Sequence, residues 1–113
     1  MSAITTHVLD TSTGRPGRQI AVTLERIAAD GPVNIGAGKT DDDGRCRDLI
    51  ADGSSFETGT YRITFEAGEY FAALGIDFFF PQVSIVFDVR DAEQHYHVPL
   101  LVSPYGYSTY RGS

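Results

Sequence analysis

Apolar and polar residues alternate along several short stretches of the chain, and this period of two is typical of half-buried β-strands. The clearest stretches are residues 4–10, 20–24, 61–65, 83–89 and 94–102. Weaker extended segments are expected at residues 33–35 and 105–110. Glycines recur between these stretches and predict turns rather than long helices. The pattern therefore predicts seven or eight short strands, which is typical of a β-sandwich, with a closed barrel as the alternative architecture.

The alternation is interrupted at two places that predict other local structure. Residues 67–74 are expected to form one short helix, because three of their apolar residues are spaced to share a helical face. Gly75 follows, where the C-terminus of a helix favours glycine. Residues 41–44 have the sequence Asp-Asp-Asp-Gly and predict a tight turn, because aspartate binds its own backbone and glycine accepts positive φ.

Length and charge narrow the class of protein. The chain has 113 residues, the length of one domain, so residues 1–113 are expected to form a single domain. A net charge of −6 and an isoelectric point of about 4.8 argue against nucleic acid or an anionic membrane surface as the partner. No apolar run of about 18 residues exists, so no membrane span is expected. The single cysteine excludes an intrachain disulfide, and no basic-then-apolar leader is visible, so we expect a cytoplasmic protein.

The chain has three histidines, His7, His95 and His97, and each falls in a predicted strand. His95 and His97 are two residues apart and therefore project from the same face. The opposite face is the better candidate for the core, and it carries Tyr96, Val98, Leu100 and Val102. The two histidines are therefore expected to be exposed or to lie against a partner subunit. Two functional interpretations remain open: a three-histidine zinc site, and acid–base catalysis by imidazole near neutral pH.

Arg45 and Arg47 flank Cys46 directly after the predicted Asp-Gly turn. In an extended segment the two arginines share a face. We interpret Arg47 as a solvated counterpart of the preceding aspartates, whereas Arg45 lies nearest to the turn and is expected to be held by it. A calcium loop is not expected, because the later ligands are missing in register. Cys46 is interpreted as a small buried residue.

The segment from 103 to 113 is rich in functional side chains, with three tyrosines, an arginine and a final Ser113. Chain ends are usually frayed and compositionally plain. One interpretation is a last strand whose tyrosines pack on the sheet. The other is that this end lies in a site and supplies hydrogen bonds from Tyr110, Arg111 and Ser113.

Several motifs together carry a resemblance to a known family. They are Thr6-His7-Val8-Leu9-Asp10-Thr11, Gly14-Arg15-Pro16, Thr40-Asp41, Asp43-Gly44-Arg45, Phe79-Phe80-Pro81, His95-Tyr96-His97-Val98-Pro99-Leu100-Leu101 and residues 103–113. The ending Tyr110-Arg111-Gly112-Ser113 is very specific in combination with the His-Tyr-His segment. Over essentially its whole length, the chain resembles the transthyretin-related proteins that act as 5-hydroxyisourate hydrolases.

The resemblance implies a fold, an assembly and an activity. The fold is a transthyretin-like all-β sandwich of two four-stranded sheets with one short helix. The assembly is a homotetramer with active sites in clefts at the dimer–dimer interface. The activity is hydrolysis of 5-hydroxyisourate, a small-molecule substrate of urate degradation, to 2-oxo-4-hydroxy-4-carboxy-5-ureidoimidazoline, with no metal or organic cofactor. The catalytic residues implied are His7, Arg45 and His97, with substrate binding by His7, Arg45, Tyr110 and Ser113.

Each implied residue has a chemical reason to be in such a site. His7 and His97 are suited to proton transfer near pH 7 and are expected to act as a pair on the attacking water. Arg45 offers a planar fork of donors that fits an oxygen-rich heterocycle and stabilises negative charge. Tyr110 and Ser113 are expected to complete the pocket. His95 falls outside this set, and Arg111 has the alternative role of pinning the tail to a neighbouring subunit.

Three other functions are weighed against the hydrolase. A carrier related to transthyretin would bind a small molecule through the same fold without turnover. A three-histidine zinc hydrolase would hold stoichiometric metal and lose activity to a chelator. A purely structural sandwich would leave the side chains of the tail unexplained.

Overall fold

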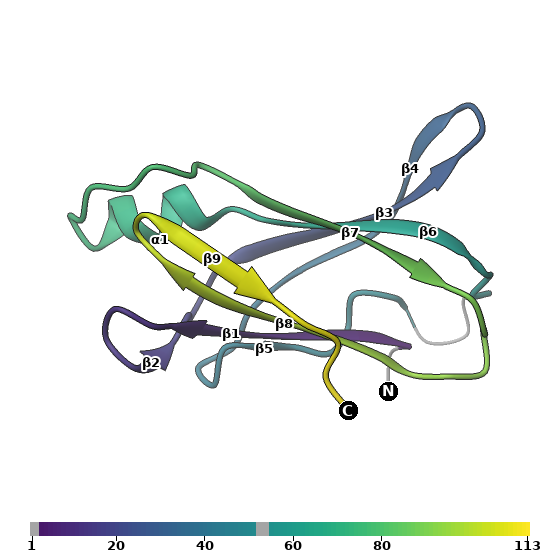
Figure 1. The fold of residues 1–113 in the computed structure, drawn as a ribbon, viewed down its shortest axis with the longest axis horizontal. Coiled ribbons are helices and arrows are strands. Elements are labelled where there is room, and N and C mark those ends of the chain that lie inside the picture. The colour runs from purple at the N-terminus through teal and green to yellow at the C-terminus, as the bar shows by residue number, and fades with distance from the viewer. Residues whose placement is uncertain (1–2, 52–54) are drawn as a thin grey trace.

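Two β-sheets pack face to face with one short helix at one end of the sandwich (Figure 1). The protein is described by a computed structural model over residues 3–51 and 55–113. The helix α1 spans Ala67–Ala73, and the strands are β1 (Ile4–Asp10), β2 (Arg15–Pro16), β3 (Ala21–Ala28), β4 (Gly31–Lys39), β5 (Arg45–Cys46), β6 (Gly59–Phe65), β7 (Val83–Val89), β8 (Tyr96–Ser103) and β9 (Gly106–Thr109). The predicted all-β sandwich with a single short helix is confirmed.

The first sheet contains the strands that matter most for function. Its order is β2-β1-β8-β9, and β5 also pairs with β1. Strands β1 and β8 run parallel, whereas β2 and β5 are antiparallel to β1 and lie along the same edge of it. This sheet therefore has five strands where four were expected. The added strands have two residues each, which is too short for an alternating pattern to reveal them.

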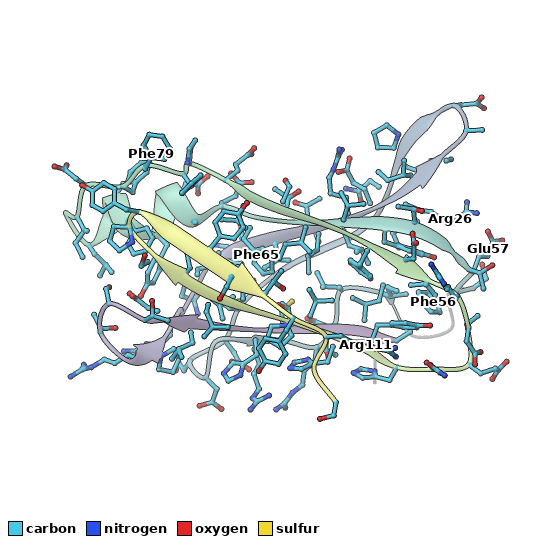
Figure 2. The ribbon with its side chains drawn as sticks, in the orientation of Figure 1. Arg26, Phe56, Glu57, Phe65, Phe79 and Arg111 are labelled. Carbon is cyan, nitrogen blue, oxygen red and sulfur yellow. The ribbon has the colours of Figure 1, made fainter. Side chains whose placement is uncertain are left out.

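The second sheet has the order β4-β3-β6-β7, all antiparallel, and matches the expected four strands. Its inner face and that of the first sheet enclose the core. Phe65 lies fully buried between the sheets (Figure 2). The alternation in β6 follows directly, since Tyr61, Ile63 and Phe65 are buried and the residues between them are not.

Helix α1 matches its predicted position, and Gly75 follows it with φ of 70°. Its packing differs from the prediction in one respect. Phe71 is buried at 1% exposure, but Leu74 is 53% exposed, so the expected apolar face is only partly covered. Tyr70 instead turns its hydroxyl to the buried carboxylate of Asp10 at 2.8 Å. This contact fixes the helix against the end of β1.

Strand β8 begins two residues later than predicted, at Tyr96. His95 therefore precedes the strand, whereas His97 lies within it. The expected division of faces is confirmed, because the core positions are buried while His95 is exposed and His97 half-buried. Both histidines thus lie on the outer side of the first sheet, away from the core.

Candidate active site

Three neighbouring strands place polar side chains on the outer face of the first sheet. Thr5 of β1 is paired with His97 of β8, and His7 of β1 is paired with Arg45 of β5. Paired residues and residues two apart on one strand share a face. Strand pairing therefore gathers these four side chains on one surface although they come from distant parts of the sequence.

A hollow of about 200 Å³ opens on this surface. The residues that line it all have polar or charged side chains: Thr5, Thr6, Arg45, Arg47, His95, His97 and Ser113. A larger hollow of about 730 Å³ lies between α1 and β2, but its lining has no histidine or cysteine among the residues described. The chemistry of the side chains therefore favours the smaller hollow.

The hydroxyl of Thr5 lies between the two histidines of the hollow. Its Oγ1 is 2.9 Å from Nε2 of His95 and 2.9 Å from Nδ1 of His97. Thr5 itself is buried at 6% exposure. Nε2 of His97 is not engaged by this contact, so the ring presents a second nitrogen for chemistry.

The surroundings of His97 favour its neutral form. Burial lowers the pKa of His97 from its usual 6.5, and the positive charges of Arg45, His7 and His95 lower the pKa further, while a hydrogen bond from the imidazole to the Thr5 backbone opposes the shift. At neutral pH this imidazole is therefore available to accept a proton.

The side chain of His7 is oriented by the loop before β5. Its Nε2 lies 2.8 Å from the carbonyl oxygen of Asp43. A carbonyl oxygen only accepts hydrogen bonds, so Nε2 of His7 carries the proton and Nδ1 holds the free lone pair. His7 does not line the 200 Å³ hollow, but it lies close enough to lower the pKa of His97.

Arg45 follows a tight turn that has the predicted form. Gly44 has φ of 78° and donates its N–H to the carbonyl of Asp41 at 2.9 Å. The carboxylate of Asp41 also accepts from the backbone N–H of Asp43 and of Arg45, both at 2.9 Å. The turn therefore fixes the start of β5 and with it the origin of the Arg45 side chain.

The tail crosses the start of β8 and carries Ser113 into the hollow. Gly112 donates its N–H to the carbonyl of His97 at 2.9 Å. The guanidinium of Arg111 lies 4.6 Å from the centre of the Tyr96 ring and donates to Oε1 of Gln94 at 3.0 Å. Arg111 thus pins the tail within its own chain (Figure 2). The alternative role, attachment of the tail to a neighbouring subunit, stays a prediction.

The structure brings together only part of the predicted set. Arg45, His97 and Ser113 line one hollow, and His7 lies beside it. Tyr110 is 61% exposed and lines a second hollow of about 260 Å³, between β7 and β8, which it shares with His97.

Sequence reasoning left four lining residues out of the site: Thr5, Thr6, Arg47 and His95. For Thr5, Arg47 and His95 the spacing contained a signal, because each lies two residues from a predicted site residue, the spacing at which extended residues share a face. Arg47 is exposed, as expected, and still contributes to the lining. Cys46 is buried, as expected, and burial raises the pKa of its thiol to about 11, so it is protonated and no nucleophile.

The donor geometry does not favour the zinc alternative. Among residues 3–51 and 55–113, no three His, Cys, Asp or Glu side chains are grouped to hold a metal ion.

Over the same residues, no helix is long and apolar enough to cross a membrane.

The fold and this histidine- and arginine-lined hollow define a transthyretin-like β-sandwich protein with a polar surface site. Residues 4–112 match the model of the HIUase/Transthyretin family, and the chain belongs to that family.

The individual relatives include 5-hydroxyisourate hydrolases and a transthyretin solved with thyroxine. A protein named 5-hydroxyisourate hydrolase 2, from Rhizobium meliloti, is 46% identical over 114 residues, covering 97% of this chain and 95% of the relative. The solved structure of Klebsiella pneumoniae 5-hydroxyisourate hydrolase is 35% identical, with a TM-score of 0.86 and full coverage of both chains, 100% each. Sea bream transthyretin in complex with thyroxine is 30% identical, with a TM-score of 0.90, covering 98% of this chain and 95% of that one.

Proposed function

We propose that this protein hydrolyses 5-hydroxyisourate to 2-oxo-4-hydroxy-4-carboxy-5-ureidoimidazoline, a step of urate degradation. The observation that carries the proposal is the joint placement of Arg45, His97 and Ser113 in one hollow, with His7 beside it. Similarity to two proteins named as 5-hydroxyisourate hydrolases supports it.

The reaction needs a base, an anion-stabilising group and an acid. Water attacks a ring carbonyl, the carbon–nitrogen bond breaks, and the leaving nitrogen takes a proton. His7 and His97 supply the acid–base groups, each with one ring nitrogen already committed to a protein contact. Arg45 binds substrate carbonyl oxygens and stabilises the charge that develops on them.

The tail supplies the remaining groups. Ser113 offers a hydroxyl at the edge of the hollow. Tyr110 lies on the neighbouring surface beside His97 and completes the pocket from that side. In a chain with net charge −6, the arginines and histidines of this surface form a local positive patch, which suits a substrate that carries negative charge.

The wider context of the site is also proposed. Residues 1–113 form one domain, and four copies assemble into a homotetramer with the sites at the interface between dimers. The protein acts in the cytoplasm and its hydrolysis needs no metal or organic cofactor.

The competing function is a carrier that binds a small molecule without turnover. Its specific support is the similarity to a transthyretin solved with thyroxine. The two functions differ in a direct way, because a carrier gives saturable binding but leaves the decay rate of 5-hydroxyisourate unchanged.

A coupled ultraviolet assay separates them. Urate oxidase generates 5-hydroxyisourate in place, and its decay is followed with the wild-type protein, with His7→Ala, Arg45→Ala and His97→Ala, and with residues 110–113 deleted. We expect rapid decay with the wild type and losses of about 10²–10⁴-fold for each change.

Arg90→Ala is the matched control, because Arg90 is an exposed arginine whose ion pair is with Asp88 at 3.7 Å, away from the hollow. It should retain wild-type activity. A folded wild-type protein that leaves the decay rate unchanged would overturn the hydrolase and favour the carrier.

A further inference from the structure

The contact of one threonine hydroxyl with two imidazoles has a chemical consequence. Thr5 Oγ1 lies 2.9 Å from a ring nitrogen of His97 and 2.9 Å from a ring nitrogen of His95. A hydroxyl has one proton to donate and two lone pairs to accept with. When Thr5 donates to one neutral imidazole, the other imidazole must donate to Thr5.

Two proton arrangements therefore satisfy both contacts. In the first, Nδ1–H of His97 donates to Thr5, and Thr5 donates to Nε2 of His95. In the second, both directions are reversed. Only the first leaves Nε2 of His97 without a proton, and a general base needs that free lone pair.

The two histidines differ in how well they tolerate a positive charge. His97 is half-buried, and its pKa is lowered by burial and then by the charges of Arg45, His7 and His95. His95 is exposed to solvent. The charged and titratable groups that line or adjoin the hollow around them include His7 from β1, Arg45 from β5 and Arg47 directly after β5. Arg111 also adjoins it, since its guanidinium donates to the carbonyl of His95 at 3.5 Å. Moving the positive charge from His97 to His95 takes it away from a half-buried ring surrounded by other cations and places it on a ring that is exposed to solvent.

On the basis of the proposed function, we propose that Thr5 relays a proton from Nδ1 of His97 to Nε2 of His95 while Nε2 of His97 deprotonates the attacking water. The water O–H bond breaks as the Nε2–H bond of His97 forms. The Nδ1–H bond of His97 breaks as a new O–H bond forms on Thr5. The original O–H bond of Thr5 breaks as the Nε2–H bond of His95 forms.

The same chain runs backwards to complete the turnover. His95 returns its proton to Thr5, Thr5 returns one to Nδ1 of His97, and Nε2 of His97 releases its proton to the leaving ring nitrogen. No proton is gained or lost by the protein over the cycle, and no further reactant is needed. Thr5 and His95 act through His97 and are positioning residues.

Substitutions at Thr5 test the relay. Thr5→Val keeps the β-branched shape but removes the hydroxyl, so we expect kcat to fall by about tenfold or more with KM unchanged. Thr5→Ser restores the hydroxyl and should recover kcat to within about threefold of the wild type. Thr64→Val is the matched control, because the Thr64 hydroxyl bonds Ser84 at 3.0 Å on the outer face of the other sheet. It should leave kcat unchanged.

A double-mutant cycle tests whether Thr5 and His95 act as one unit. His95→Gln should also lower kcat by about tenfold, far less than His97→Ala. In a relay, losing either member breaks the chain, so Thr5→Val with His95→Gln should lose about tenfold in total. A loss of about a hundredfold in the double variant would mean independent effects and would overturn the relay.

Nitrogen NMR of the histidine rings gives a readout that does not depend on activity. In the wild type, His97 should carry its proton on Nδ1 and His95 should have an unprotonated Nε2. The opposite tautomers, or wild-type kcat in a folded Thr5→Val variant, would overturn the relay while leaving the hydrolase intact. The tautomer pattern tests the relay alone. The proposed function is tested separately, because a folded wild-type protein that does not hydrolyse 5-hydroxyisourate would overturn it.

Discussion

Gly112 lies against the ring of His97 without room for a side chain. A Cβ at Gly112 would lie 2.6 Å from Cδ2 of His97 and 3.2 Å from Cγ of Pro99. The Gly112 N–H also bonds the carbonyl of His97. The orientation of His97 is therefore set by two neighbours, Gly112 through close packing and Thr5 through its hydroxyl.

Gly112→Ala should move either the His97 ring or the tail that carries Ser113. We expect a fall in kcat of about tenfold or more, because small misplacements of a reacting group are costly. The Tm should change little, since the residue lies at the edge of the fold. Gly106→Ala in the same tail is the control, because its Cβ would meet only Oγ of Ser103 at 3.8 Å. Equal activity of the two variants would contradict the packing role.

The pH dependence of His97 is predicted by the charges around it. Its pKa is lowered, so the neutral base persists to a lower pH than for an ordinary histidine. The acid limb of kcat/KM should therefore have its midpoint below 6.5, with activity lost as the pH falls through it. Arg45→Gln removes a like charge and should raise the pKa of His97, measured by NMR titration of its ring. Arg90→Gln should leave that pKa unchanged.

Among the elements, the turn of residues 41–44 contributes most to the site. The turn holds His7 beside the hollow and Arg45 in its lining, since the carbonyl oxygen of Asp43 accepts from His7 and the carboxylate of Asp41 accepts from the backbone N–H of Arg45. The hydrogen bond from Arg45 also lowers the pKa of Asp41. Gly44 is required at the corner, because a Cβ there would lie 2.4 Å from the carbonyl oxygen of Val8 and φ is positive.

Asp41→Ala removes the acceptor that organises the turn. We expect kcat/KM to fall by about tenfold, because both Arg45 and His7 lose part of their support. Asp41→Asn keeps one acceptor oxygen and should lose less. Asp42→Ala, a change at an exposed aspartate of the same turn, should behave as the wild type. If Asp41→Ala and Asp42→Ala have the same activity, the turn does not position the site.

The length of a strand decides whether it can be predicted from the sequence. Strands of seven or eight residues, such as β1, β6 and β7, repeat the alternation often enough to be predicted. Strands β2 and β5 have two residues each and owe their existence to pairing with β1, which no local pattern records. Arg45 lies in one of these short strands, so its place beside His7 follows from tertiary pairing.

At the scale of the whole molecule, the family resemblance predicted which residues meet in the site, whereas no local sequence pattern shows why they meet. His7, Arg45, His97 and Ser113 were implied by the family resemblance. Their meeting depends on the parallel pairing of β1 with β8 and on the return of the tail. The same pairing brought in Thr5, which has no unusual chemistry in the sequence and becomes notable only between two histidines.

The proposed homotetramer predicts the mass of the protein in solution. Exposed large side chains at Phe79, Tyr105 and Tyr107 form apolar surface near the β8–β9 connection, and assembly of four copies would cover surface of this kind. Light scattering after size exclusion should give about four times the chain mass of 12.3 kDa. A single-chain mass at full hydrolytic activity would contradict the assembly.

The parallel pairing of β1 with β8 has a consequence for how the molecule folds. Thr5 and His97 are 92 residues apart in sequence, whereas β3 and β4 of the other sheet are joined by a short turn. Contacts between distant residues form more slowly, because closing a long loop costs more entropy. We expect the second sheet to form first in refolding experiments and catalysis to return only with the slowest phase. We therefore expect hydrolytic activity to be the last property that the chain gains during folding.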